Sequence, residues 1–339
     1  MSKTRDALAV LAEGQNLNDE QMRAAMTEIM GGDADPAQIG GFLMALRVKG
    51  ETPAEIAAAA SVMRGFASRV NIDREGLTDI VGTGGDGASL FNVSTASAFV
   101  AAAAGVRVAK HGNRSVSSKS GAADVLEAAG CRLDLNADQV AGLIDELGVG
   151  FLFAPQHHGA MKHAIGPRKS LGLRTLFNLL GPLTNPALAP NQVLGVFSAD
   201  LVRPMAEVMQ ALGSRHVLVV HSRDGLDEIS PVAKTLVAEL KDGSIHEFEL
   251  DPADHDVRID SLESLVVADA AASLALIETA LDGQPGPAAD IIALNAGAAI
   301  YVSGQVPDLA AGIVTARSVL ASGAGLKRLQ TYAARSRAL

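Results

Sequence analysis

The stretch DIVGTGGDGASLFNVSTASAFVAAAAGVRVAKHGNRSVSSKSG, residues 79–121, decides the fold. A short apolar run ends in the glycine-rich segment 82–87, and a run of small apolar residues follows, which predicts a strand, a loop and a helix. Four glycines in six positions leave the backbone N–H groups of the loop open to an anion. A second predicted strand, residues 106–109, ends in the cationic and serine-rich segment 110–120. We therefore expect two phosphate-binding loops at neighbouring strand ends.

The spacing G-x-G-x-x-G in residues 82–87 also matches the fingerprint of dinucleotide-binding folds. In those folds the third glycine lies inside the helix, and an acid about twenty residues later binds the ribose. Here we expect the helix to begin where Asn92, Ser94 and Thr95 can cap it and can offer free N–H groups to an anion. The second strand ends in cations, not in an acid. A nucleotide cofactor is therefore the weaker interpretation.

Four collinear motifs resemble those of the anthranilate phosphoribosyltransferase family. They are GTGGDG with FNVST, KHGNRSVSSKSGAADVLEAAG, FLFAPQHHGAMKHAIGPRKSLGLRTLFNLLGPLTNP and DGLDEIS, beginning at residues 82, 110, 151 and 224. The resemblance implies an Mg²⁺-dependent pentosyltransferase of tryptophan biosynthesis. Such an enzyme moves the phosphoribosyl group of 5-phosphoribosyl 1-pyrophosphate (PRPP) to the amine of anthranilate and releases pyrophosphate.

The sequence pattern changes near residue 72 of 339. Before that point the spacing of apolar residues and the caps at Asn18 and Thr52 predict four helices, the last one running to Val70. After it, short apolar runs alternate with helices, which predicts a largely parallel sheet covered on both faces. We therefore expect an α/β protein with a small all-helical domain, 1–72, and a large α/β domain, 73–339. The resemblance implies a nucleoside-phosphorylase-like fold in which a segment of about 155–186 returns to the helical domain.

Composition excludes several classes of function. A net charge of −10 leaves no net-basic surface for a nucleic-acid backbone, so we expect no nucleic-acid partner. The N-terminal segment lacks the apolar core of a secretory signal, and no run of eighteen apolar residues is present, so we expect a cytoplasmic protein without a membrane partner. The single cysteine, Cys131, cannot form an intramolecular disulfide and is expected to pack as a small apolar residue.

The resemblance assigns substrate contacts to the two loops and to one arginine. The residues expected to contact PRPP or anthranilate are Gly82, Gly85, Asp86, Asn92, Ser94, Thr95, Lys110, His111, Gly112, Asn113, Arg114, Ser117, Ser118 and Arg168. Of these, Lys110, Asn113 and Arg168 are expected to act in catalysis. Arg168 follows Gly166-Pro167 at the predicted mouth of a helical segment, and its planar guanidinium suits the carboxylate of anthranilate.

Adjacent acids at a strand end predict a metal site. Asp224-Gly225-Leu226-Asp227-Glu228 follows a predicted strand, and such carboxylates suit Mg²⁺ shared with substrate phosphates. Alone, the motif would be an ordinary acidic turn. The resemblance implies two Mg²⁺ ions per subunit, with Asp227 and Glu228 as ligands and Ser94 as a ligand of another ion. Zinc at His157, His158 and His163 is the weaker interpretation, because no carboxylate or cysteine completes the ligand set at a suitable spacing.

Two other functions stay open from the sequence. A pyrimidine nucleoside phosphorylase shares the fold, but the spelling KHGNR fits it poorly; a non-catalytic nucleic-acid binder should carry a basic stripe. The resemblance also implies a homodimer formed through the helical domain. The first two predicted helices carry apolar residues on more than one face, among them Leu8, Val10, Met22 and Met26. This apolar surface faces either a partner subunit or the α/β domain.

Overall fold

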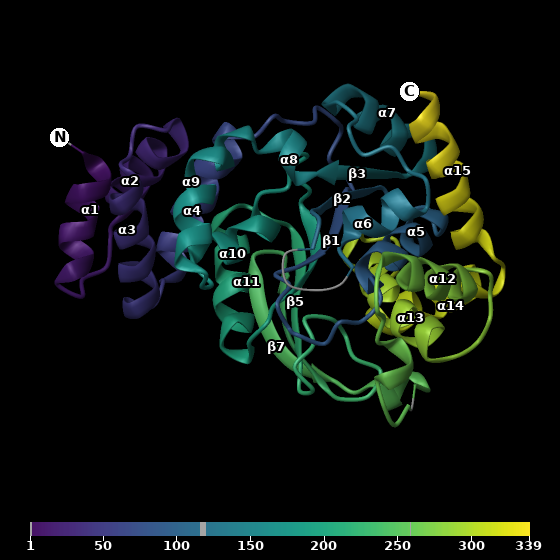
Figure 1. Ribbon diagram of the computed structural model, residues 1–339. Coiled ribbons are helices and arrows are strands. Elements are labelled where there is room, and N and C mark those ends of the chain that lie inside the picture. Colours follow the sequence, from purple (N-terminus) through teal and green to yellow (C-terminus); the bar gives the residue numbers. More distant parts are fainter. Residues whose placement is uncertain (1, 116–119, 258) are drawn as a thin grey trace.

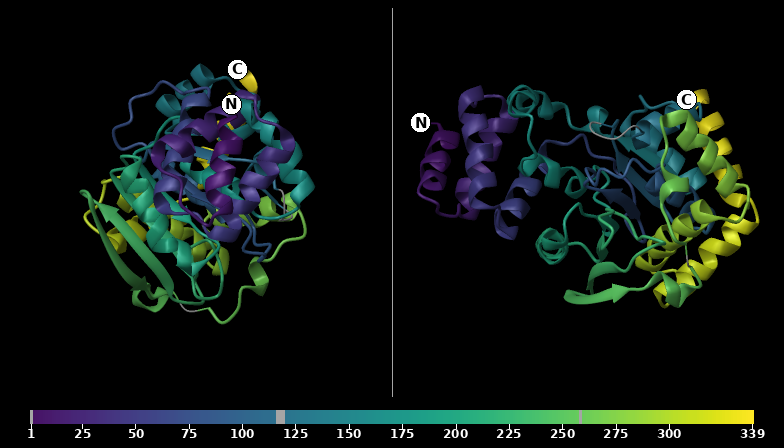
Figure 2. Two further views of the ribbon diagram at one scale, coloured as in Figure 1. Left: turned by 90° about the vertical axis from the view of Figure 1, so that its left-hand side faces the viewer. Right: turned by 60° about the horizontal axis from the view of Figure 1, so that its bottom comes forward.

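The computed structural model describes residues 2–115, 120–257 and 259–339. A helical bundle built from the N-terminal residues forms one end of the molecule, and an α/β body forms the other (Figure 1). The N-terminus lies at the tip of the bundle, and the C-terminus lies on the far side of the body. Figure 2 shows the bundle projecting beyond the body in a second direction of view.

The bundle consists of four helices whose starts are defined by side-chain caps. They are α1 (Lys3–Ala12), α2 (Asp19–Gly31), α3 (Pro36–Lys49) and α4 (Pro53–Phe66). Asn18 and Thr52 each form a capping box at the predicted position. The prediction that the fourth helix runs to Val70 is wrong. Beyond Phe66 the chain is extended, because the backbone N–H groups of Ser68 and Val70 bind carbonyls of the segment around residues 157–186 instead of the preceding helical turn.

A seven-stranded sheet forms the centre of the body, in the order β3-β2-β1-β4-β5-β6-β7. Its strands are β1 (Thr78–Gly82), β2 (Val108–Gly112), β3 (Val149–Phe153), β4 (Asn191–Gly195), β5 (His216–Ser222), β6 (Thr235–Lys241) and β7 (Ser244–Leu250). The first five pair in parallel, which confirms the predicted largely parallel sheet. The antiparallel hairpin β6–β7 at one edge was not predicted.

Helices cover both faces of the sheet. On one face α5 (Val93–Ala103) and α13 (Pro287–Val302) contact the central strands. On the opposite face α11 (Val202–Ala211) lies against β5, β6 and α4. The other helices of the body are α6 (Ala122–Ala128), α7 (Ala137–Leu147), α12 (Ala270–Leu281), α14 (Leu309–Ala321) and α15 (Ala324–Ala338). Between β3 and β4 the chain forms α8 (Ala154–His157), α9 (Lys162–Leu171) and α10 (Leu176–Leu180), and α9 and α10 pack on the bundle helices α2, α3 and α4. Short 3₁₀ turns occur at Gly159–Met161, Gly181–Leu183, Ala199–Leu201, Pro252–His255 and Glu263–Leu265.

Successive side chains along each strand point to opposite faces of the sheet, so the interior of the protein is divided into two hydrophobic cores. Val193 and Leu218 contribute to a core shared with α5 and α13, whereas their neighbours Leu194 and Val217 point to the opposite face. That second face shares one continuous core with α11 and with the bundle helices. The bundle is therefore joined to the sheet by apolar packing as well as by the chain.

This second core answers the question of the apolar residues on the first two helices. Met22 and Met26 are fully buried within one chain, and Leu8 and Val10 are half-buried. Of the two alternatives left open by the sequence, cover by the rest of the same chain accounts for Met22 and Met26, because α9, α10 and the body extend the core of the bundle. An exposed apolar side chain does occur on α3, where Val48 is 81% accessible.

Cys131 is buried among apolar side chains, as predicted, and burial raises the pKa of its thiol to about 12. Among the described residues no single helix is both long and apolar enough to cross a membrane, although the bent pair Leu309–Ala321 and Ala324–Ala338 passes the same test of length and composition together.

Two glycines on adjacent strands allow a third chain segment to approach closely. Gly82 of β1 pairs with Gly195 of β4, and the segment at Asp227 crosses directly over this pair. A Cβ atom on Gly195 would lie 1.6 Å from the carbonyl oxygen of Asp227, and one on Gly82 would lie 2.4 Å from its carboxylate. Only glycine at both positions permits this contact.

We expect Gly195→Ala to displace the Asp227 segment and to destabilise the protein by about 1–3 kcal/mol through overpacking. Gly142→Ala is the control, because a Cβ on that exposed residue of α7 meets no atom within 4 Å. The control should be neutral or should stabilise the helix by up to about 1 kcal/mol. Urea unfolding measures both, and an unchanged midpoint for Gly195→Ala would contradict the close-contact argument.

Candidate active site

The candidate site lies at the carboxyl edge of the parallel strands. From β1 the chain passes through α5 to β2 on one side, whereas β4 lies on the other side of β1. Such a reversal of strand order is where open α/β sheets bind their ligands. The glycine-rich loop, which we define as residues 83–91, leaves β1 at this point, and the Asp227 segment follows β5 at the same edge.

The glycine-rich loop needs glycine for its conformation. Gly84, Gly85 and Gly87 all have positive φ, which an L side chain rarely adopts. Arg174, in the segment between α9 and α10, donates a hydrogen bond to the carbonyl of Gly85 and stacks on Phe197 with its guanidinium 4.4 Å from the ring centre. Arg174 was not predicted as a site residue, although it lies within a quoted motif, because nothing in its spacing points to a loop 89 residues earlier.

The N-terminus of α5 faces the same edge. Asn92 is the N-cap, and its side chain accepts a hydrogen bond of 3.0 Å from the backbone N–H of Thr95. The hydroxyls of Thr95 and Ser120 are buried and have no hydrogen-bond partner within the described residues. Buried polar atoms are seldom left unpaired, so hydroxyls of this kind mark a place where a polar ligand can bind.

Lys110 lies inside β2, because this strand extends to Gly112 and does not end at Ala109 as predicted. Its ammonium group is buried and donates to the carbonyl of Ile80 at 2.7 Å and to the hydroxyl of Ser94 at 3.0 Å. Burial lowers the pKa of Lys110, and nearby Asp79 and Glu228 oppose this shift. The strand thus holds a cation beside the first residues of α5.

Asp79 is a buried acid that the sequence analysis did not select. Its carboxylate accepts hydrogen bonds from the backbone of His111 at 3.0 Å and from the side chain of Asn185 at 2.7 Å. Burial raises the pKa of Asp79 to about 6, against the opposing effect of Lys110. Asn185 also donates to the carbonyl of Ala109, so this pair ties β1, β2 and the segment before β4 together.

The acidic pair Asp227–Glu228 lies against the glycine-rich loop and α5. Asp227 accepts a 2.7 Å hydrogen bond from the backbone of Gly84, and the nearby backbone of Ser94 favours the charged form of Glu228 and so lowers its pKa. Burial raises the pKa of Asp227 to about 6, with repulsion from Asp86 as a further cause. Burial and then repulsion from Asp227 raise the pKa of Glu228 well above its usual value. Three carboxylates near one another create a demand for a cation.

The chemistry of this donor set fits Mg²⁺. Among the described residues no cluster of three or more histidine, cysteine, aspartate or glutamate side chains has the arrangement of a complete metal site. Mg²⁺ does not require one, since it commonly binds one or two carboxylates and takes its remaining ligands from substrate phosphates and water.

A histidine pair and Arg168 lie on the side of the returning segment. The Nε2 atoms of His111 and His158 are 3.2 Å apart. Burial lowers both pKa values, that of His158 to about 4, so both rings are neutral at pH 7. Arg168 is half-buried, with its guanidinium 5.3 Å from the ring centre of Phe177. It lies in the last turn of α9 and not at a helix mouth as predicted, since Pro167 lies inside that helix.

The rest of the second loop is only partly described. Asn113 is exposed, and its side chain accepts a hydrogen bond from the backbone of Arg114. The guanidinium of Arg114 binds Asp124 at 3.0 Å and Glu127 at 2.8 Å, so its charge is neutralised by α6 in this conformation. The predicted substrate contacts Ser117 and Ser118 lie outside the described residues.

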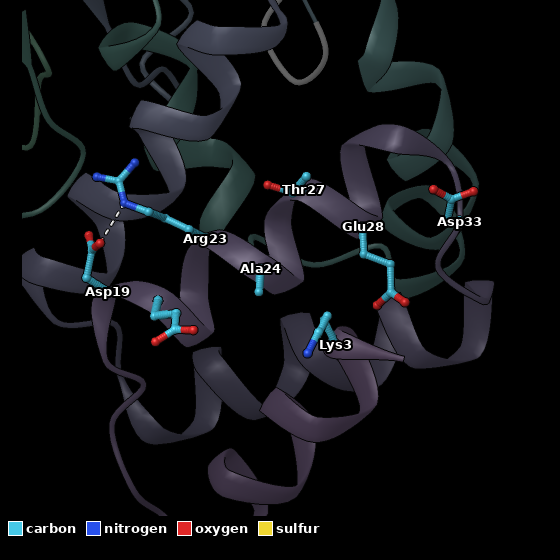
Figure 3. Close-up of a pocket in the computed structure, with 8 residues that line it drawn as sticks. Lys3, Asp19, Arg23, Ala24, Thr27, Glu28 and Asp33 are labelled. Atoms are coloured by element: carbon cyan, nitrogen blue, oxygen red, sulfur yellow. Dashed lines mark hydrogen bonds and ion pairs between the residues drawn. The ribbon is translucent and has the colours of Figure 1, made fainter. Parts of the chain in front are cut away.

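An open groove lies away from the candidate site, on the helical bundle. This groove of about 650 Å³ runs between α1 and α2, and Figure 3 shows its lining, which includes Lys3, Glu28 and the ion pair between Arg23 and Asp19. None of the residues at the carboxyl edge of the sheet lines this groove. Its size therefore carries no argument about the chemistry at the strand ends.

Two protein-family models match this chain and define its class as a glycosyl transferase. A model described as "Glycosyl transferase family, a/b domain" matches residues 74–326, and one described as "Glycosyl transferase family, helical bundle domain" matches residues 5–67. The two domains of the fold are those of this class of transferase.

Individual relatives and solved structures indicate one family within this class of transferase. The anthranilate phosphoribosyltransferase of Alkalilimnicola ehrlichii is 59% identical over 326 residues, 96% of each chain. The crystal structure of the Thermus thermophilus enzyme has a TM-score of 0.93 and 44% identity and covers 99% of this chain and 100% of its own. The structure of the Saccharomyces cerevisiae enzyme in complex with PRPP and Mg has a TM-score of 0.90 and 29% identity, and it covers 99% of this chain and 98% of its own. The same enzyme in complex with 4-fluoroanthranilate has a TM-score of 0.89 and 28% identity, with the same coverage of both chains.

This chain belongs to the anthranilate phosphoribosyltransferase family. The family predicted from four sequence motifs is confirmed, as is the predicted fold class of a helical domain with a largely parallel α/β domain.

The raised pKa of Asp227 predicts how stability depends on pH. The folded state binds the Asp227 proton more tightly than the unfolded state, so this group stabilises the fold below about pH 4, and its contribution is lost as pH rises to about 6. Asp227→Asn should remove this pH-dependent loss of stability, because the variant has no carboxyl group to titrate at that position. Its amide oxygen can still accept the hydrogen bond from Gly84, so the local fold is kept. Urea unfolding in chelator should show that the variant gains stability over wild type between pH 4 and pH 6.5. Glu20→Gln, at an exposed position of α2, is the control. If the free energies of unfolding of Asp227→Asn and wild type differed by the same amount at every pH, the raised pKa of Asp227 would be contradicted.

Proposed function

We propose that this chain transfers the phosphoribosyl group of PRPP to the amine of anthranilate, releasing pyrophosphate, as a step of tryptophan biosynthesis in the cytoplasm. The observation that carries the proposal is the contact of the Asp227–Glu228 segment with Gly82, Gly84 and Ser94. It brings together acids for a metal, open backbone N–H groups for phosphates and the buried cation of Lys110. Membership of the family supports the choice of substrates.

The donor is proposed to bind over the glycine-rich loop and the N-terminus of α5. Loop N–H groups, the helix dipole and Lys110 all favour negative charge, so they hold the pyrophosphate and stabilise the charge that it gains as it leaves. Among the proposed donor contacts are also Gly85, Asp86, Asn92, Thr95, Ser117 and Ser118. Lys110 is prepared for this task, since Ile80 and Ser94 hold its ammonium group in place before a ligand arrives.

Mg²⁺ bound with the donor would neutralise the pyrophosphate and the acidic pair together. We propose Asp227 and Glu228 as ligands of one ion and Ser94 as a ligand of a second. The mutual repulsion of Asp86, Asp227 and Glu228 supports this, because a divalent cation would relieve it.

The acceptor is proposed to lie between Asn113, His111 and Arg168, beside the backbone of Gly82. Arg168 has no carboxylate partner within the described residues, and burial lowers its pKa, so the carboxylate of anthranilate would supply the missing counter-charge. The neutral His111–His158 pair can accept or donate a hydrogen bond at the amine without carrying a charge. An arylamine is neutral at pH 7, so attack on the ribose carbon needs no strong base.

An assay that follows the loss of anthranilate fluorescence tests the function. We expect turnover only when PRPP, anthranilate and Mg²⁺ are all present. Asp227→Asn combined with Glu228→Gln should lose most activity at limiting Mg²⁺ while keeping the circular dichroism spectrum of wild type. Glu20→Gln, at an exposed position of the bundle, should behave as wild type. No turnover by wild type under any condition would reject the proposed reaction, and full turnover by the double variant would reject the metal ligands.

The role of Arg168 predicts a selective effect on one substrate. Arg168→Ala should raise the KM for anthranilate roughly ten- to a hundredfold, since a charge-assisted contact of this kind is worth about 1.5–3 kcal/mol. The KM for PRPP should change little. Lys169→Ala, one residue further along α9 and exposed, is the matched control. An equal rise in both KM values would place the acceptor carboxylate elsewhere.

We further propose a division of the chain at residues 72 and 73 and a homodimer formed through the helical domain. Burial of Met22 and Met26 within one chain removes them from the argument. The exposed Val48 of α3 and the half-buried Leu8 and Val10 of α1 are the apolar side chains of the bundle that a partner would cover. Val48→Asp should shift wild-type dimers toward monomers in sedimentation velocity. Val314→Asp, at a 64% exposed position of α14, should not. A monomeric wild type would reject the dimer, and an unaffected dimer would move its interface away from α3.

A further inference from the structure

A second group of cations lies where the bundle joins the body. Arg64 is in the last turn of α4, and Arg69 and Arg74 lie in the linker of residues 67–77 that leads to β1. All three line a pocket of about 210 Å³, together with Ser61 and Ser214, and no carboxylate lines it. We name it the linker pocket.

The linker pocket lies at the opposite edge of the sheet from the candidate active site. Its lining includes Pro190, directly before β4, and Ser214, two residues before β5, so the pocket adjoins the amino ends of these strands. The glycine-rich loop leaves the carboxyl end of β1. A five-residue strand spans about 16 Å, so one small anion cannot contact both places.

Arg64 is held rigidly in this pocket. Its Nε donates to the carbonyl of Leu183 at 2.7 Å, and its Nη1 donates to the carbonyl of Leu212 at 3.4 Å. Burial lowers the pKa of Arg64 to about 10, and the neighbouring charge of Arg74 adds to this, yet the group stays charged at pH 7. The cationic side chain at the ends of α4 and α11 suits the helix dipoles, which explains why an arginine occupies position 64.

The helix dipoles do not explain the other two arginines. The side chains of Arg69 and Arg74 are exposed and form no ion pair or hydrogen bond within the described residues. Asp73, the acid adjacent to Arg74, is instead 3.6 Å from Arg107, whose guanidinium also binds Asp145 at 2.7 Å. Three like charges therefore converge on one small pocket without a counter-charge, although the chain as a whole carries ten excess negative charges.

We propose that the linker pocket binds an inorganic phosphate or pyrophosphate anion. Guanidinium groups match phosphate oxygens through paired hydrogen bonds, and the hydroxyls of Ser61 and Ser214 line the same space. The pocket is smaller than the roughly 300–1,000 Å³ typical of sites for larger organic ligands, which favours a small anion over a nucleotide. A bound anion would connect α4, the linker and the end of α11, and so would strengthen the junction of bundle and body.

The test uses isothermal titration of pyrophosphate and, separately, of phosphate, without Mg²⁺ and at low ionic strength. It is performed in a Ser94→Asp background, because a carboxylate at the N-terminus of α5 repels anions from the active site while suiting the helix dipole. We expect the Ser94→Asp protein to bind one anion per chain. Whichever of the two titrations, with pyrophosphate or with phosphate, gives the tighter binding identifies the preferred anion. Adding Arg69→Ala and Arg74→Ala should weaken binding at least about tenfold.

Two controls separate the pocket from general electrostatic attraction. Arg215→Ala removes an exposed arginine that follows Ser214 without lining the pocket, and it should bind as the Ser94→Asp parent does. The pair Arg69→Lys with Arg74→Lys keeps the charges and should lose less than the alanine pair. Absence of binding in the Ser94→Asp protein would overturn the proposal, and so would an equal affinity of the alanine pair and its parent. These results do not depend on transferase activity, so failure of the proposed function would leave them interpretable.

Discussion

The contact between the Asp227 segment and the glycine pair Gly82–Gly195 governs the geometry of the candidate site. At that crossing the chain lies so close to the ends of β1 and β4 that a single methyl group would separate them. The contact orients Asp227 toward the backbone of Gly84 and brings Glu228 to the first turn of α5. A sheet edge thereby gains two acids that the strands themselves do not carry.

The same crossing concentrates buried charge at one point. Asp79 and Glu228 each lie within electrostatic reach of Lys110, and burial shifts the pKa of each group in the direction that favours its neutral form. Burying charged groups costs stability unless partners compensate them. Here the compensation within the chain is partial, because the acids near the glycine-rich loop outnumber the one buried lysine. A polyanion bound together with a divalent cation would complete the balance.

The second core determines which residues from distant parts of the chain meet at the site. Residues of the bundle pack continuously with β4, β5 and α11, and the returning helices α9 and α10 join the same core. Arg47 of α3 donates to the carbonyl of Arg174 at 2.7 Å, and Arg174 in turn contacts Gly85. The bundle, the returning segment and the glycine-rich loop are therefore connected through these hydrogen bonds of Arg174.

Local pattern was sufficient for the class of protein and much of its fold. The four bundle helices, the glycine-rich loop and the cap at Asn92 follow from residues close together in sequence, whose preferences are set by backbone conformation and neighbouring N–H groups. The antiparallel hairpin β6–β7, the end of α4, the burial of Met26 and the roles of Asp79, Asn185, Arg174 and Gly195 did not follow from it. Each of these depends on contacts between segments far apart in the chain, for which spacing along the sequence holds no signal. The sequence by itself determined the chemistry available to the site, and the tertiary structure decided which of those groups meet, because burial and close approach exist only after the chain has folded.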